Sequence, residues 1–256
     1  MHSEVNKRRA ARQKQARKRH LIVALIILMI IALITLVIMC FTTFFDINHI
    51  STTGSEIYSK EEIYAASGIT KEDSLLIISE DKIEENIRKQ LPYVDSVKIK
   101  RNLPDKIVLT VTDAKEYAYY VSGNSNFILS ENGYVLKEQS ETPENVFEII
   151  TSGINGKPGE KAIYANSAEE QLVNELISAL NQKGINIDKI DITNTLEIKV
   201  FVEGKFEVNV GDNKYINEKI AHLASMIESI ADRKGSINLS MWTPENSQGS
   251  FVEAKE

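Results

Sequence analysis

Residues 91–113 read LPYVDSVKIKRNLPDKIVLTVTD, and this stretch decides the fold of the region around it. Apolar and polar side chains alternate in it twice, before and after a break at residues 102–104 that contains a proline. The alternating apolar residues are Val97 and Ile99, then Ile107, Leu109 and Val111. Because a period of two places alternate side chains on one face of a strand, the pattern predicts two half-buried strands joined as a β-hairpin.

Two short helices are expected upstream of this hairpin. Ser59 and Glu62 form an S-x-x-E capping box ahead of the first helix, and Gly68 suits its C-terminal cap. The second helix is expected to begin near Asp81 and to stop before Pro92, since proline cannot continue a helix. The apolar positions of the second helix are spaced by four and share one face: Ile83, Ile87 and Leu91.

A strand within residues 45–54 completes this unit, so residues 46–114 are predicted to fold in the order strand, helix, helix, strand, strand. Residues 115–240 are interpreted as a second, β-rich domain with two helices. The expected strands cover residues 117–121, 126–129, 134–137, 146–150, 185–192, 196–202, 206–210 and 236–241. The predicted fold class is therefore α+β.

The two helices of the second domain are predicted from their capping residues. Ser167 and Glu170 are expected to cap a helix over residues 167–182. A longer helix is predicted downstream, with Asp212 as its N-cap and Gly235 as its C-cap.

Residues 21–41 form an unbroken apolar run, LIVALIILMIIALITLVIMCF, without a charged residue. As a helix it would span about 31 Å at ~1.5 Å per residue, which matches a hydrocarbon core of ~30 Å. The run is longer than the apolar region of a signal peptide, and no small-residue cleavage site follows it. The sequence therefore predicts a single uncleaved transmembrane helix, which with its flank occupies residues 21–45.

The charges on either side of this run predict its orientation. The formal charge of −6 divides into +7 over residues 1–20 and −13 over the rest of the chain. The basic residues of the N-terminal tail are Lys7, Arg8, Arg9, Arg12, Lys14, Arg17, Lys18 and Arg19. The positive-inside rule places this tail in the cytoplasm and residues 46–256 outside the membrane. The tail also favours anionic lipid headgroups.

The composition excludes several classes of site. The one cysteine, Cys40, lies in the apolar run, so a disulfide framework within the chain and a cysteine zinc site or nucleophile in the outer part are excluded. The four histidines do not supply a histidine metal site, and the acidic outer part would repel nucleic acid. We expect no cofactor, no metal and no nucleic-acid partner.

Three motifs that look catalytic are better explained as structure. Ser79-x-x-Lys82 matches S-x-x-K, but the chain has no K-T-G to accompany it. Residues 153–159 read G-x-x-G-x-x-G, which is neither a dinucleotide-binding nor a P-loop pattern. Glu61 and Glu62, like the other paired glutamates, begin a helix, where negative charge is favourable. The sequence predicts that the protein is not an enzyme; a membrane-anchored extracytoplasmic hydrolase or cell-wall-binding protein is the alternative.

The first unit resembles the POTRA domain of the bacterial cell-division proteins FtsQ and DivIB. The residues that carry the resemblance are Tyr58, Ser59, Glu61, Glu62, Ile63, Ser67 and Gly68, then Leu91, Pro92, Val94, Val97, Ile99, Arg101, Pro104, Ile107, Leu109 and Val111. Residues 128–136 are similar to a hairpin of that family. Lys219, Gly235 and the sequence INLS at residues 237–240 are similar to the family's K…G-x-I-D-L ending, with Asn238 in place of the usual aspartate.

The resemblance implies a bitopic division protein that acts as an adaptor in the divisome. Its extracytoplasmic domains would bind FtsB/DivIC-type and FtsL-type partners, and through them help to control the septal peptidoglycan synthase. It would be a single-pass, type II protein of the cell membrane at the division septum. A POTRA-bearing translocation component is the other interpretation, but it would need a membrane barrel, and no stretch of alternating lipid-facing strands is apparent.

The C-terminal residues form the candidate partner site. Residues 241–256 are a polar tail with a terminal strand expected at residues 249–252. Little charge protects the edge of such a strand, which favours pairing with a strand of a partner. The candidate partner-binding residues are Ile237, Leu239, Trp242, Ser250, Phe251 and Val252. The alternative is that residues 236–241 are an internal strand and residues 249–252 a disordered tail.

A second candidate set is a basic patch on the hairpin of the first unit. Its members are Lys98, Lys100, Arg101 and Lys106. Charged side chains on an edge strand prevent unwanted pairing, and that is the interpretation we favour. Contact with an acidic partner, a lipid or a wall polymer is the alternative.

Overall fold

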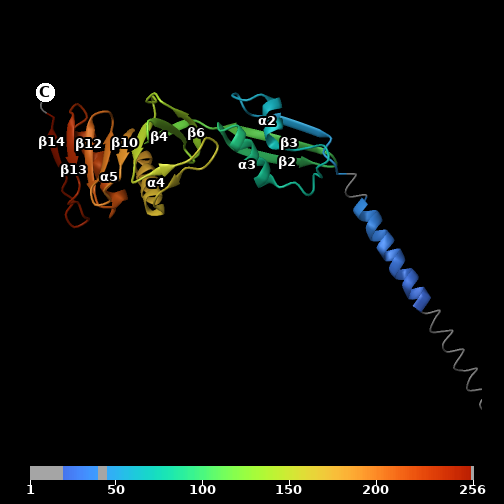
Figure 1. Cartoon of the computed structure of the whole chain (residues 1–256). Helices are drawn as coiled ribbons and strands as arrows, with labels where there is room; N and C mark the ends of the chain where they lie inside the picture. The colour runs from blue at the N-terminus through green and yellow to red at the C-terminus, as the bar shows by residue number, and fades with distance from the viewer. Residues whose placement is uncertain (1–19, 40–44, 255–256) are drawn as a thin grey trace, which may run out of the picture. The chain divides into compact units, whose positions relative to one another are not determined.

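The computed structural model describes residues 20–39 and 45–254 (Figure 1). The basic tail predicted to set the topology lies outside the described residues. The helix His20–Met39 has a mean hydropathy of 3.5, and none of its most apolar window is buried. It is long and apolar enough to cross a membrane, which is consistent with the predicted anchor and a single-pass membrane protein.

Residues 46–113 contain the elements predicted for the first unit, in the predicted order. They are β1 (His49–Thr53), α2 (Lys60–Ser67), α3 (Glu80–Gln90), β2 (Val94–Asn102) and β3 (Lys106–Asp113). The strands form a sheet in the order β1-β3-β2, so β2 lies at an edge. The Ser59 hydroxyl accepts from the Glu62 N–H, and the Glu62 carboxylate accepts from the Ser59 N–H. The capping box is therefore confirmed, as is the left-handed C-cap at Gly68 (φ 69°).

The apolar side chains that alternate in the hairpin or recur along α3 are buried, apart from Ile99, which is half-buried. Those with the smallest exposed fractions are Ile87, Ile107, Leu109 and Val111. Ile47, Ile63 and Leu75 are buried with equally small exposed fractions. Burial of these side chains stabilises the unit through the hydrophobic effect. A charged residue at any of these positions would be buried and would destabilise it.

Residues 116–253 form a nine-stranded sheet with two helices. The strands are β4 (Glu116–Ser122), β5 (Ser125–Ser130), β6 (Val135–Gln139), β7 (Phe147–Ile150), β10 (Ile187–Asp191), β11 (Ile198–Val202), β12 (Phe206–Gly211), β13 (Gly235–Asn238) and β14 (Ser250–Glu253). Their order is β14-β13-β12-β11-β10-β7-β4-β5-β6 (Figure 1). A two-stranded ribbon pairs β8 (Ile154–Asn155) with β9 (Ile163–Tyr164). The helices are α4 (Ser167–Gln182) and α5 (Ile216–Ser229).

The two helices cover one face of this sheet. Strand β11 shows the division, because Ile198, Val200 and Val202 are buried in one cluster with apolar residues of α4 and α5. The alternate residues Lys199 and Phe201 are only half-buried and belong to the opposite face. Among the described residues, no helix covers that opposite face, which we call the open face.

The helix ends of this domain differ from the sequence prediction. Asn166, and not Ser167, caps α4 by accepting a hydrogen bond from the Ala168 N–H. Helix α5 begins at Ile216 after Tyr215, a residue with left-handed backbone (φ 58°) and no side-chain capping bond. The predicted cap Asp212 lies upstream of that point, and Gly235 belongs to β13 because α5 has already ended at Ser229. These predictions were therefore wrong.

Asp212 is held by a buried lysine. The Lys219 side chain is 1% exposed, and its Nζ donates to the Val210 carbonyl (2.8 Å), the Asp212 carbonyl (3.0 Å) and the Asp212 carboxylate (3.1 Å). Burial alone would raise the pKa of Asp212, but hydrogen bonds from Lys219 and from the Lys214 N–H outweigh burial and lower it. Lys219 thus fixes the start of α5 to the end of β12.

Candidate functional site

Strand β14 provides an unpaired sheet edge. It pairs antiparallel with β13 on one side, with Ser236 opposite Val252 and Ile237 opposite Phe251. In the part of the chain that the structure describes, no strand lies on its other side. Strand β13 is internal, because it also pairs parallel with β12. Residues 250–253 are therefore an ordered edge strand.

Hydrogen bonds already made by β13 show which main-chain groups of β14 face outward. Gly235 donates its N–H to the Lys205 carbonyl, on the β12 side, and Ala254 donates to the Lys234 carbonyl. The N–H and C=O groups of successive residues in a strand point to opposite sides. Those of Ser236 and Val252 therefore point toward each other across the β13–β14 ladder. The N–H and C=O groups of Phe251 and Glu253 then point to the open edge.

Gly235 allows β14 to lie this close to β13. A Cβ atom on Gly235 would stand 2.2 Å from the Val252 carbonyl oxygen and 2.9 Å from a ring carbon of Phe251. A real Cβ cannot approach backbone that closely, so any other residue at 235 would push β14 away. Glycine at this position is a requirement of the strand pairing.

The structure corrects three of the predicted contact residues. Ile237 is 1% exposed, Leu239 is fully buried and Trp242 is 8% exposed. All three belong to the cluster between the sheet and its helices, where the Trp242 ring lies 6.2 Å from the ring of His222 in α5. Their side chains are part of the core that supports the edge, and they are not available to contact a partner directly.

The other three predicted residues lie on β14 itself. Phe251 is half-buried against the same core, and its ring meets Phe206 edge-on at 6.3 Å between centroids. Ser250 is exposed, and Val252 is 63% exposed. Glu253 is the one charged residue of β14, so an exposed valine lies on an edge with little protecting charge, which suits β-augmentation by a partner; the partner contact itself remains a prediction.

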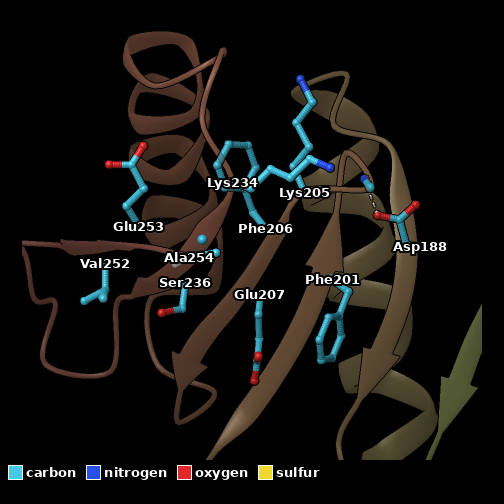
Figure 2. Close-up of a pocket in the computed structure, with 12 residues that line it drawn as sticks. Asp188, Phe201, Lys205, Phe206, Glu207, Lys234, Ser236, Val252, Glu253 and Ala254 are labelled. Carbon is cyan, nitrogen blue, oxygen red and sulfur yellow. Dashed lines mark hydrogen bonds between the residues drawn. The ribbon is translucent and has the colours of Figure 1, made fainter. Parts of the chain in front are cut away.

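A hollow of about 630 Å³ adjoins this edge on the sheet. Figure 2 shows Phe201, Glu207, Ser236 and Val252, which project from the four neighbouring strands β11 to β14. The strand registers place these residues opposite one another, Phe201 to Glu207, Glu207 to Ser236 and Ser236 to Val252. They form one row on the open face that leads to the edge.

Charged residues surround one end of the hollow. Lys205, Lys234 and Asp188 line it, and the Asp188 carboxylate accepts from the Gly204 N–H at 2.6 Å (Figure 2). Lys205 Nζ donates to the Ala231 carbonyl at 3.0 Å. The rim thus carries both signs of charge, and the Asp188 and Lys205 side chains are each held by a contact with the backbone.

Sequence reasoning did not single out Phe201, Glu207 or Glu253 as part of this site. The alternation in IKVFV, residues 198–202, already separates Lys199 and Phe201 from the buried valines. That signal assigns Phe201 to a more exposed face, but the neighbours it meets there depend on the strand order. Only the structure supplies that order.

The predicted basic patch lies on β2 and at the start of β3. Lys98, Lys100, Arg101 and Lys106 are all exposed. Arg101 is engaged within the domain, because it pairs with Glu80 at 3.0 Å and donates to the Ile78 carbonyl at 3.1 Å. Since β2 is an edge strand, Lys98 and Lys100 stand where edge-protecting charge is expected.

Among the described residues, no three His, Cys, Asp or Glu side chains are grouped so that they could hold a metal ion. The arrangement at β14 consists of main-chain donors and acceptors beside an apolar side chain. Its chemistry is that of strand pairing.

Comparison with known proteins identifies the family. The POTRA domain of the FtsQ type matches residues 45–113. The cell division protein DivIB of Clostridium acetobutylicum is 27% identical over 203 residues, which cover 77% of this chain and 80% of that protein. The chain is thus similar over most of its length to cell-division proteins of the FtsQ/DivIB family.

Other members of the FtsQ/DivIB family match in the same way. DivIB of Bacillus subtilis is 24% identical over 232 residues, which cover 90% of this chain and 84% of that protein. FtsQ of Streptomyces venezuelae is 29% identical over 109 residues, 43% of this chain and 40% of that protein. The predicted family and α+β fold class are confirmed, and the chain is a division protein. The division between its two domains at residue 114 stays a prediction.

Proposed function

We propose that this FtsQ/DivIB protein is a divisome adaptor that captures a strand of a partner on the edge of β14. The partners are of the FtsB/DivIC and FtsL types, and the adaptor influences septal peptidoglycan synthesis through them. The observation that supports this proposal is the outward-facing main chain of Phe251 and Glu253 beside the exposed Val252. Main-chain hydrogen bonds would supply affinity, and Val252 with its row on the open face would supply specificity.

The membrane helix gives this adaptor its place in the cell. The N-terminal tail lies in the cytoplasm, and residues 46–256 lie outside, at the division septum. The eight basic residues before the helix support this orientation. A fluorescent fusion should form a midcell band in dividing cells, and an even distribution over the membrane would contradict the septal location.

The edge can be tested with proline at residue 253. Glu253 has an exposed side chain, and its N–H faces the open edge, so Glu253→Pro removes a donor for the partner and leaves the β13 ladder intact. The variant loses one hydrogen bond to the partner, and the proline ring also blocks the approach of its strand. The affinity should fall by about tenfold or more, since ~1.4 kcal/mol of binding free energy corresponds to a tenfold change in Kd. Glu253→Ala keeps the donor and is the matched control.

The measurement is a titration of the full chain in nanodiscs with an FtsB/DivIC-type ectodomain. We expect Glu253→Pro to weaken binding, Glu253→Ala to leave it nearly unchanged, and a chain that ends at residue 246 to lose it. Equal affinity of the proline and alanine variants, or of the truncated and complete chains, would refute the edge as the site of capture.

A further inference from the structure

Three large apolar side chains are exposed on two segments of the POTRA domain. Leu76 is 42% exposed and Ile77 is 78% exposed, and both lie in the segment between α2 and α3. Leu103 is 63% exposed and lies in the turn between β2 and β3. Side chains of this kind clustered on a surface mark a contact with another molecule or with a membrane.

Both segments are hydrogen-bonded to the stretch of chain that follows the membrane helix. The Leu75 N–H donates to the Phe45 carbonyl at 2.8 Å, directly beside Leu76. The Asn48 N–H donates to the Asp105 carbonyl at 3.0 Å, two residues from Leu103. The two apolar segments therefore meet at residues 45–48, the part of the domain nearest in sequence to the helix.

Arg101 fixes the two segments to one another. Its guanidinium donates to the Ile78 carbonyl at 3.1 Å, next to Ile77, and pairs with Glu80 at 3.0 Å. This contact holds the segment before α3 against the hairpin. It also neutralises the Glu80 carboxylate, which would otherwise oppose transfer of this surface out of water.

The length of chain limits how far this surface can be from the bilayer. The described part of the helix ends at Met39, and Phe45 is six residues further on. A fully extended chain spans at most about 3.6 Å per residue, so Phe45 lies within about 22 Å of the helix end. The hydrocarbon core of a bilayer is ~30 Å thick, and the headgroup regions on its two sides bring the total to ~40–45 Å. The lipid surface is therefore within reach of these segments in every copy of the protein.

We propose that Leu76, Ile77 and Leu103 insert into the interfacial region of the bilayer that anchors the chain. The POTRA domain would then rest on the membrane by this end instead of turning freely on its tether. The insertion is apolar, so it should occur on zwitterionic as well as anionic lipid. It does not depend on the partner proposed for β14.

The test uses the full chain, with Cys40→Ser to remove the one natural cysteine, reconstituted into phosphatidylcholine vesicles. Single cysteines replace Ile77, Leu103 or, as a control, Leu196, and each carries a polarity-sensitive fluorophore. Leu196 is as exposed as Ile77, at 78%, and lies between β10 and β11. We expect blue-shifted emission and quenching by brominated lipid at residues 77 and 103, and emission typical of water at residue 196.

A second variant asks whether the apolar side chains cause the insertion. With the fluorophore at residue 103, Ile77→Asn should reduce the blue shift and the lipid quenching while the melting temperature stays unchanged, because Ile77 is exposed. Emission typical of water at both residues 77 and 103 would overturn the proposal and favour a protein contact at this surface. Quenching that appears only with anionic lipid would also overturn it, because basic residues would then carry the contact.

Discussion

Replacing Lys219 by methionine should destabilise the β domain by about 3 kcal/mol. The buried Nζ donates to two backbone carbonyls and one carboxylate, and methionine fills a similar volume without a donor. A buried acceptor left without a partner costs about 1–3 kcal/mol. The Val210 carbonyl is buried and should contribute most of the loss. The Asp212 carboxylate is 37% exposed, so water can replace part of its bond.

The single tryptophan reports on this region. Trp242 is 8% exposed, and its ring lies 6.5 Å from the ring of Tyr215, at the start of α5. Its fluorescence in a urea titration of residues 46–256 should therefore follow the unfolding of the part that Lys219 holds. With a slope of about 2 kcal/mol per molar urea, a loss of about 3 kcal/mol lowers the midpoint by about 1.5 M.

Lys205→Met is the control for this prediction. Lys205 is also a lysine whose Nζ donates to a backbone carbonyl, that of Ala231, but it is exposed. Its replacement should change stability by no more than about 0.5 kcal/mol. If the two variants lowered the urea midpoint equally, burial of the ammonium group would not be the source of its importance, and the reasoning from the three acceptors would fail.

Three further predictions concern the core, acid stability and topology. Ile87→Asp should cost several kcal/mol in thermal melts, about 3 or more, because it buries a charge, while Lys98→Ala should be nearly neutral; the reverse order would contradict the burial pattern. Since folding lowers the pKa of Asp212, its stabilisation is present above the unfolded value of about 3.9 and is lost as the pH falls through the folded value. Asp212→Asn should therefore lose less stability than the natural chain between about pH 5 and pH 2, and equal acid titrations would contradict this. Protease added to protoplasts should remove residues 46–256 and leave the anchor, and protection of that part would contradict the orientation.

The elements of the POTRA domain could be predicted because local patterns specify them. The capping box at Ser59 and Glu62 uses side chains three residues apart, and the hairpin shows its period of two within residues 91–113. Alternation also indicated the strands that are β11 and β12 in the second domain. Such signals need no knowledge of distant contacts, which is why they were reliable here.

The start of α5 could not be predicted in this way, because a distant group competes for Asp212. Aspartate is a favoured N-cap, and the sequence offers one at a suitable position. In the structure its carboxylate accepts from Lys219, seven residues later, and the helix begins at Ile216 without a side-chain cap. The carboxylate also accepts from the Lys214 N–H, so it closes a turn ahead of the helix and bonds Lys219 instead of capping α5.

At the candidate site, too, the strand could be predicted from local sequence, but the burial of its neighbouring side chains could not. The sequence indicated a terminal strand with an unprotected edge, and β14 lies at the end of the sheet. It also suggested Ile237, Leu239 and Trp242 as contacts, because large apolar residues beside a polar tail resemble interface anchors. Which face of β13 the helices cover depends on where α5 packs, and that packing buries all three.

The groups best placed to bind a partner are main-chain atoms, and this explains why side-chain types were a poor guide to them. The direction of an N–H follows from the strand register, and the pairing of Ser236 with Val252 turns Phe251 and Glu253 outward. A shift of one residue would instead expose the main chain of Ser250 and Val252, with no change in composition. Gly235 permits that register, because a Cβ there would meet the Val252 carbonyl at 2.2 Å. Replacing Gly235 should therefore disturb the edge, although the Gly235 N–H bonds on the β12 side, and the surface proposed for partner binding on β14 depends on the strand behind it.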